Sequence, residues 1–276
     1  YYYEFFSYIM YIKLKRNIFL YLFTLLLFLR CAYFNTFYNA EESFESALNI
    51  IENSPILDDE KLSPEAENFL DKTIDNSRTV IDDYPDSKYI NKAYLLIGIS
   101  SFYKKSYNMS INNLEKVIDL EDIDIRNEAT LWIAYSFLKQ KNIAQTEHYL
   151  DVLSKENLNK ENLYIYYTIK AEISELKGVL DESYQNYILA SRATSKNSRK
   201  IYIYRKLIKL AEESDDILSK VKYIELLIEN IEDTNKIKDL KIDWIEAKKK
   251  LGHYEDIIAE VDLSLGDPLF LFIEPK

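Results

Sequence analysis

The stretches Tyr94-Leu-Leu-Ile-Gly98 and Thr130-Leu-Trp-Ile-Ala134 decide the fold, because they lie 36 residues apart and share one apolar pattern ending in a small residue. Beyond Ala134 the same position recurs at intervals of 37 residues. The repeated position is occupied by Gly98, Ala134, Ala171, Ile208 and Ile245. A constant interval of this length is typical of chains built from stacked, repeated units.

Two more apolar positions recur with the same interval. Nine residues after the first position stand Tyr107, Ile143, Leu180, Ile217 and Tyr254. Sixteen residues after it stand Leu114, Leu150, Tyr187, Ile224 and Val261. The repeat therefore extends over both halves of each unit.

Each unit predicts two amphipathic helices, because its apolar residues recur at three- and four-residue intervals. The segments expected to separate helices are 82–88, 105–108, 177–178 and 251–253. Pro85 cannot continue the first of two helices, and Asp86 or Ser87 can cap the second. In the unit that follows, the second helix is expected to include Ile111, Leu114, Val117 and Ile118.

The predicted fold is all-α. A single helical hairpin cannot bury its apolar face alone, so neighbouring hairpins must stack into a superhelix. A long antiparallel bundle is the alternative, but a bundle does not require a constant period. We therefore expect repeats of 36–37 residues at 63–265. The other expected segments are a signal peptide or signal anchor at 1–30, a capping helix and loop at 31–62, and a tail at 266–276.

Composition narrows the possible functions. The net charge of −11 repels a phosphate backbone, which argues against nucleic-acid binding. One cysteine and two histidines leave no disulfide framework and no ligand-spaced metal site. The sequence contains no glycine-rich phosphate loop and no nucleophile elbow. We expect no enzyme activity, no cofactor, no metal and no small-molecule substrate.

The N-terminus is typical of an exported or membrane-anchored protein. Basic residues at 13–16 precede an apolar run at 17–29, which is the layout of a secretory signal. Cys31 follows this run and resembles the lipid-modified cysteine of bacterial lipoproteins. Arg30 stands where that family has a small residue, so an uncleaved signal anchor remains the alternative.

The repeat resembles the tetratricopeptide repeat, and Tyr94, Gly98, Tyr107 and Ser110 carry the resemblance. It implies a right-handed superhelical solenoid. The segment Asp83-Tyr-Pro-Asp-Ser-Lys-Tyr89 and the opening Cys31–Ala40 resemble tetratricopeptide lipoproteins of outer-membrane β-barrel assembly (BamD-like). That resemblance covers roughly residues 31–155 and implies a scaffold on the periplasmic face of the outer membrane.

In such a solenoid, the first helix of each hairpin lines a groove that accepts extended peptides or partner helices. The side chains expected to line it are Lys92, Leu95, Ile99, Phe102, Tyr103, Leu131, Tyr135, Leu138, Lys139, Thr168, Glu172, Tyr202, Arg205, Lys209, Glu246 and Lys249. The expected groove is thus aromatic in its N-terminal half and charged in its C-terminal half. Phe102, Tyr103 and Tyr135 are candidate partner contacts, with packing between helices as the alternative.

The function expected from these features is a membrane-tethered scaffold that binds other proteins or extended peptides, in outer-membrane protein assembly. The alternative is a scaffold or non-catalytic regulatory subunit of another cell-envelope process, such as secretion or cell-wall remodelling, held by an uncleaved anchor.

Overall fold

The structure is a computed structural model that describes residues 15–16, 35–52, 62–153 and 155–264. The predicted signal segment, Cys31 and the tail at 266–276 lie outside these residues. Among the described residues all regular secondary structure is helical, which confirms the all-α prediction. After a helix at 35–52, the elements are α2 (Pro64–Asp83), α3 (Ile90–Tyr103), α4 (Tyr107–Leu114), α5 (Ile123–Lys139), α6 (Ile143–Asp151), η1 (Lys155–Asn157), α7 (Lys160–Leu176), α8 (Leu180–Ala193), α9 (Asn197–Glu213), α10 (Ile217–Ile228), α11 (Thr234–Leu251) and α12 (Tyr254–Ser264).

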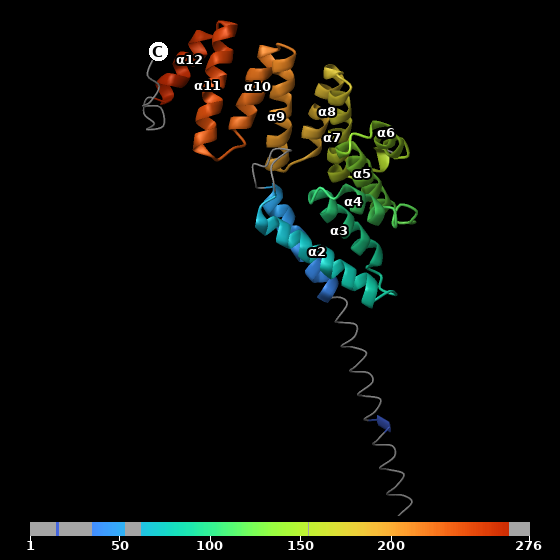
Figure 1. The fold of residues 1–276 in the computed structure, drawn as a ribbon. Coiled ribbons are helices and arrows are strands. Elements are labelled where there is room, and N and C mark those ends of the chain that lie inside the picture. The colour runs from blue at the N-terminus through green and yellow to red at the C-terminus, as the bar shows by residue number, and fades with distance from the viewer. Residues whose placement is uncertain (1–14, 17–34, 53–61, 154, 265–276) are drawn as a thin grey trace, which may run out of the picture. The chain divides into compact units, whose positions relative to one another are not determined.

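The helices from α3 onward follow one another as pairs joined by tight turns (Figure 1). The second helix of each pair begins at a residue that the repeat pattern singled out: Tyr107, Ile143, Leu180, Ile217 or Tyr254. Within the pairs, α3 packs on α4, α7 on α8, α9 on α10 and α11 on α12. The sequence period therefore corresponds to a pair of helices.

The turns within the pairs share one backbone geometry. Two residues before each second helix, φ is positive: 58° at Lys105, 60° at Lys141, 73° at Gly178, 54° at Asp215 and 73° at Gly252. The next residue donates its N–H to the carbonyl five positions back, at 2.8–3.0 Å in all five turns. This is the Schellman arrangement that closes a helix with a left-handed residue.

Two compact units make up the chain. The first contains residues 35–51, α2, α3, α4 and α5 as far as Ser136, and the second contains Glu52 and the described residues from Phe137 onward.

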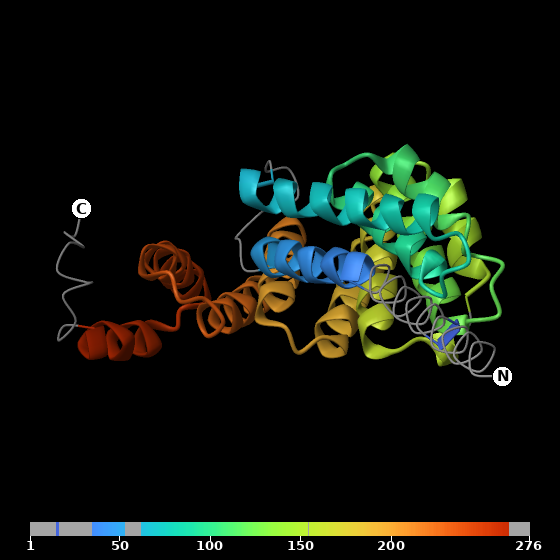
Figure 2. The same ribbon diagram turned by 90° about the horizontal axis from the view of Figure 1, so that it is seen from below.

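In the first unit, helix 35–52 lies beside α2 (Figure 2). Phe37 and Ala40 pack with Val80 of α2 and with Ala93 and Leu96 of α3. The ring of Phe37 also stacks on Tyr89, with 4.4 Å between the ring centroids. The N-terminal helix thus covers an apolar face of α2 and α3.

Small residues at the repeated position let the paired helices approach each other closely. In the first unit Gly98 of α3 faces Leu114 of α4, and a Cβ at Gly98 would lie 2.4 Å from Leu114 Cγ. In the second unit the corresponding residues, Ala171 and Tyr187, belong to one core cluster and are both fully buried. The first and third repeated positions therefore meet inside a helix pair.

The core of the second unit continues from pair to pair. Ile203, Leu207 and Leu210 of α9 pack with Tyr187 and Ala190 of α8. Val221 and Ile224 of α10 pack with Trp244 and Ala247 of α11. α8 and α10 are therefore each covered by the first helix of the following pair.

Two local predictions were wrong. α4 ends at Leu114, so Val117 and Ile118 lie in the turns that follow it and not in the helix. Neither Asp86 nor Ser87 is the N-cap of α3. That position is Tyr89, whose own N–H donates to Ser87 Oγ at 3.2 Å.

Candidate partner-binding face

Aromatic side chains of α3 and α5 form a cluster in the first unit. The ring centroid of Phe102 lies 4.8 Å from that of Tyr135 and 4.9 Å from that of Trp132. Tyr103 lies 5.5 Å from Trp132. The structure thus brings together the three aromatic residues proposed from the sequence and adds Trp132, which the groove prediction missed. The missed signal was its place three residues before Tyr135, on the same side of a helix.

Several residues predicted to line a groove are buried in this unit. Leu131 is completely buried, and Leu95, Ile99 and Phe102 expose no more than 8% of their surface. The cause is that every residue from 95 to 102 is buried, so α3 packs against neighbours all round this segment. These four side chains fill the core and offer little surface to a partner. Lys92 is exposed, and Tyr103 and Tyr135 are half-buried.

In the second unit, Glu172 of α7 connects the first helices of successive pairs. Its carboxylate accepts hydrogen bonds from Lys139 Nζ of α5 and from the Tyr202 hydroxyl of α9, each at 2.9 Å. Glu172 is only 8% exposed, so both partners compensate the burial of its charge. Lys139, Glu172 and Tyr202, all predicted to share the groove, are therefore in direct contact.

The remaining predicted residues of this unit include Thr168 of α7 and Arg205 and Lys209 of α9. Arg205 is half-buried, whereas Lys209 is exposed and forms an ion pair with Glu213 at 3.6 Å. Thr168 of α7 is buried, and its hydroxyl donates to the carbonyl of Tyr164 at 2.8 Å. Lys209 thus offers an exposed charged side chain on a first helix of the second unit.

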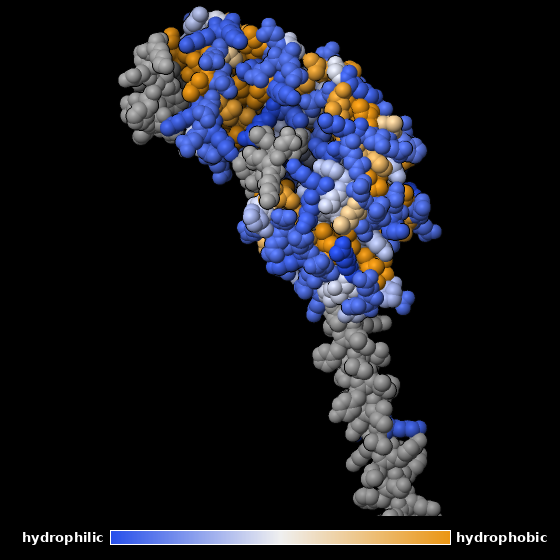
Figure 3. Space-filling view, in the orientation of Figure 1, coloured by the Kyte–Doolittle hydropathy of each residue, from blue (hydrophilic) through white to orange (hydrophobic). Residues whose placement is uncertain are grey.

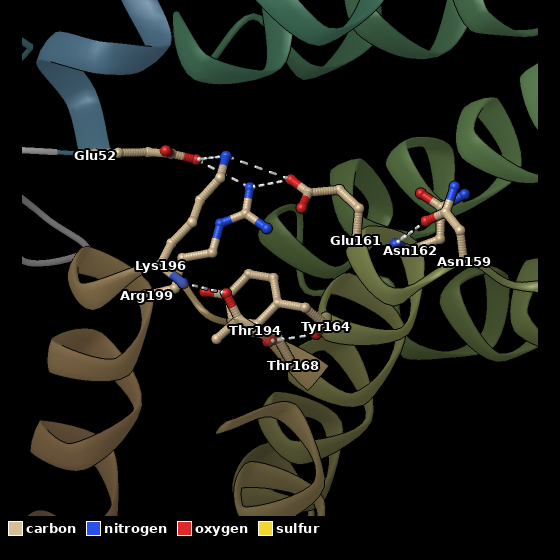
Figure 4. A network of polar contacts seen from close by, with 9 residues as sticks. All are labelled: Glu52, Asn159, Glu161, Asn162, Tyr164, Thr168, Thr194, Lys196 and Arg199. Carbon is tan, nitrogen blue, oxygen red and sulfur yellow. Dashed lines mark hydrogen bonds and ion pairs between the residues drawn. The ribbon is translucent and has the colours of Figure 1, made fainter. Parts of the chain in front are cut away.

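A second charged network surrounds Arg199 at the start of α9 (Figure 4). Arg199 pairs with Glu161 of α7 and donates to Glu52 Oε1 at 2.9 Å. Lys196 reaches the same atom of Glu52 at 3.0 Å. The guanidinium of Arg199 also lies over the ring of Tyr164, 4.5 Å from its centroid. Arg199, whose side chain is 11% exposed, thus connects the start of α9 to Glu161 near the start of α7 and to Glu52.

Burial and neighbouring charges act in opposite directions on the pKa values of Arg199 and Tyr164. Burial alone would lower the pKa of Arg199, but the carboxylates of Glu161 and Glu52 hold that pKa above its ordinary value. Burial raises the pKa of Tyr164 well above its ordinary value, and Arg199 offsets only part of this rise. Arg199 therefore stays charged beside a neutral tyrosine.

No sequence pattern indicated the Arg199 network. Glu52 and Arg199 are 147 residues apart, and neither occupies one of the recurring apolar positions. A glutamate and an arginine that form an ion pair cannot be distinguished in a sequence from a glutamate and an arginine that do not. Only the repeat interval, which aligns the starts of α7 and α9, could have suggested that Glu161 and Arg199 lie on neighbouring helices.

In the part of the chain that the structure describes, no cluster of histidine, cysteine, aspartate and glutamate is arranged to hold a metal ion. Among these residues there is also no helix both long and apolar enough to span a membrane. No protein-family model and no curated protein matches the chain.

Proposed function

We propose that this chain is a scaffold of tetratricopeptide-type helical pairs that binds other proteins or extended peptides through its first helices. The observation that carries the proposal is the turn repeated at Lys105, Lys141, Gly178, Asp215 and Gly252. These turns recur at intervals of 36 and 37 residues with positive φ in each, which supports a repeated arrangement of the two helices in each pair. Stacked pairs of this kind form a right-handed solenoid whose first helices line an extended surface.

The charged and aromatic side chains of the first helices support a role in partner binding. Lys92 and Lys209 are exposed, and Tyr103, Tyr135 and Tyr202 are half-buried. Half-buried tyrosines are suited to partner contact, because a rigid ring offers a large area and a polar tip at low entropic cost. The ion pair of Lys139 and Glu172, at 2.9 Å, joins the neighbouring first helices α5 and α7.

We further propose that the scaffold is tethered to a membrane on the periplasmic side, through Cys31 or through an uncleaved segment at 13–29. The proposed membrane tether rests on the sequence features of the N-terminus and on the resemblance to outer-membrane β-barrel assembly lipoproteins. Arg30 beside Cys31 favours a second candidate: a scaffold or regulatory subunit of another envelope process, held by an uncleaved anchor.

Two measurements on the full chain separate these candidates. Mass spectrometry of the mature N-terminus should find a lipid-modified Cys31, and an intact Lys13–Leu29 segment would rule out the lipoprotein. Affinity purification from cross-linked membranes should recover β-barrel assembly components. Recovery of secretion or cell-wall components instead would support the second candidate, and recovery of no protein would contradict both.

A further inference from the structure

A cavity of about 290 Å³ lies between α6, α7 and the start of α8 in the second unit. Two of its lining residues, Leu150 of α6 and Ile173 of α7, are apolar and expose only 6% and 5% of their surface. Figure 3 shows hydrophilic residues interspersed with hydrophobic ones over these helices. The cavity therefore has an apolar floor within a polar surface, and its volume is near the lower end of the range for small-molecule sites, about 300 Å³.

Charged side chains of both signs line this cavity. An ion pair between Lys177 of α7 and Glu147 of α6 neutralises two of them. The others are Lys170 of α7, Asp151 at the end of α6 and Glu182 in the first turn of α8. Among the residues that the structure describes, the ammonium of Lys170 forms no ion pair with these carboxylates or with any other. Opposite charges thus face one cavity without neutralising each other.

These unpaired charges indicate the chemistry of a ligand. Lys170 is half-buried, so its ammonium loses part of its hydration without an anion to compensate the loss. A carboxylate of the ligand would supply that anion. Asp151 and Glu182 leave two negative charges against one positive charge, so the other charged groups of the ligand should be cationic. The apolar floor at Leu150 and Ile173 suits an aliphatic chain between the charged groups.

We propose that this cavity binds a free basic α-amino acid. The carboxylate of the ligand pairs with Lys170, its ammonium groups pair with Asp151 and Glu182, and its aliphatic chain lies over the apolar floor. The ligand is bound and not converted. The site adds a binding function to the proposed scaffold and does not depend on it, because it requires no other protein.

The test titrates L-lysine into the purified full chain in detergent at low ionic strength and follows binding by saturation-transfer NMR. The wild-type chain should bind L-lysine with a dissociation constant on the order of 0.1–1 mM, because a ligand of this size makes few contacts. Two further probes each lack one charged group: L-norleucine has no side-chain ammonium, and cadaverine has no carboxylate. Each should bind at least about tenfold more weakly than L-lysine.

Variants assign the contacts to particular side chains. Lys170→Gln should weaken the binding of L-lysine at least about tenfold but should not weaken the binding of cadaverine, which also shows that the cavity is intact. Asp151→Asn combined with Glu182→Gln should weaken the binding of both. Lys200→Gln is the matched control, since Lys200 of α9 is also half-buried and forms no ion pair among the described residues, but lies outside the cavity.

Several results would overturn the proposal. One is the absence of saturation transfer to L-lysine at about 10 mM, which is at least about tenfold above the expected dissociation constant. Another is equal binding of L-lysine and L-norleucine. A third is that Lys170→Gln weakens L-lysine and cadaverine by the same factor, or weakens L-lysine no more than Lys200→Gln does, because Lys170 is assigned to the carboxylate of the ligand alone.

Discussion

Gly98 of α3 lies directly against the side chain of Leu114 in α4. A Cβ at Gly98 would come within 2.4 Å of Leu114 Cγ and 2.5 Å of Leu114 Cδ2. Leu114 is completely buried, so it cannot move aside without disturbing its neighbours. The two residues stand sixteen positions apart, which is the spacing between the first and third recurring positions of every repeat.

Gly98→Ala should therefore lower the free energy of unfolding by up to about 2 kcal/mol. Overpacking costs about 1–3 kcal/mol, and the better helix propensity of alanine returns only about 1 kcal/mol. Leu114→Ala should remove the clash, so a double-mutant cycle measured by urea denaturation should give a favourable coupling energy of about 1 kcal/mol or more. Additive effects would mean that the two side chains do not meet.

Substitutions at the left-handed turn residues should change the free energy of unfolding in opposite directions, depending on whether the native residue is glycine. Lys105, Lys141 and Asp215 adopt a conformation that costs an L-residue about 1 kcal/mol or more. Lys141→Gly should raise the free energy of unfolding by about 0.5–1 kcal/mol, whereas Gly252→Ala should lower it by about 1 kcal/mol although no atom lies within 4 Å of the added Cβ. Lys222→Gly, at an exposed position inside α10, is the control and should destabilise by about 1 kcal/mol.

Arg199 and Lys196 bind the same oxygen of Glu52 but should differ in their contribution to stability. The side chain of Arg199 is 11% exposed and that of Lys196 is 43% exposed. Arg199→Ala should cost about 2–3 kcal/mol, because it leaves Glu52 and Glu161 without their buried partner. Lys196→Ala should change the stability by less than about 0.5 kcal/mol. The measurement is the thermal unfolding of both variants. Equal losses of stability would mean that burial of the guanidinium does not increase its contribution to stability.

Alkaline pH should destabilise the chain through Tyr164 and Tyr223. Burial raises the pKa of each above its ordinary value of about 10, and for Tyr223 the hydrogen bond with Tyr184 acts in the same direction. Above about pH 10 the unfolded chain releases protons that the folded chain keeps, so the free energy of unfolding falls as pH rises. Below pH 10 this contribution is fully present.

The measurement is the slope of the free energy of unfolding between about pH 10 and pH 11. Tyr164→Phe and Tyr223→Phe should each reduce the slope. An unchanged slope in both variants would show that neither hydroxyl is held protonated by the fold.

Sequence periodicity located the helical pairs because one physical requirement recurs in each. Tyr107, Ile143, Leu180 and Ile217 each begin a second helix and are half-buried, and Tyr254 continues their interval although it is 60% exposed. The small residue at Gly98 or Ala171 and the large residue sixteen positions later follow from the close approach of the same two helices.

Periodicity could not distinguish a groove from a core. Leu131 and Tyr135 share one side of α5, yet Leu131 is completely buried while Tyr135 is half-buried. What covers each residue is decided by the neighbouring pair and not by spacing within the helix. For the same reason the sequence did not show that Glu172 would meet both Lys139 and Tyr202, or that Glu52 would meet Arg199.

The most direct test of the proposed scaffold is site-specific photo-cross-linking on the full chain in its native membrane. A photoreactive amino acid at Lys92 or Lys209, both exposed on first helices, should give discrete cross-linked products with other proteins. The same amino acid at Glu182 or Lys222, both exposed on second helices, should give none. Products of equal yield at all four positions, or products only at Glu182 and Lys222, would contradict the claim that partners bind along the first helices.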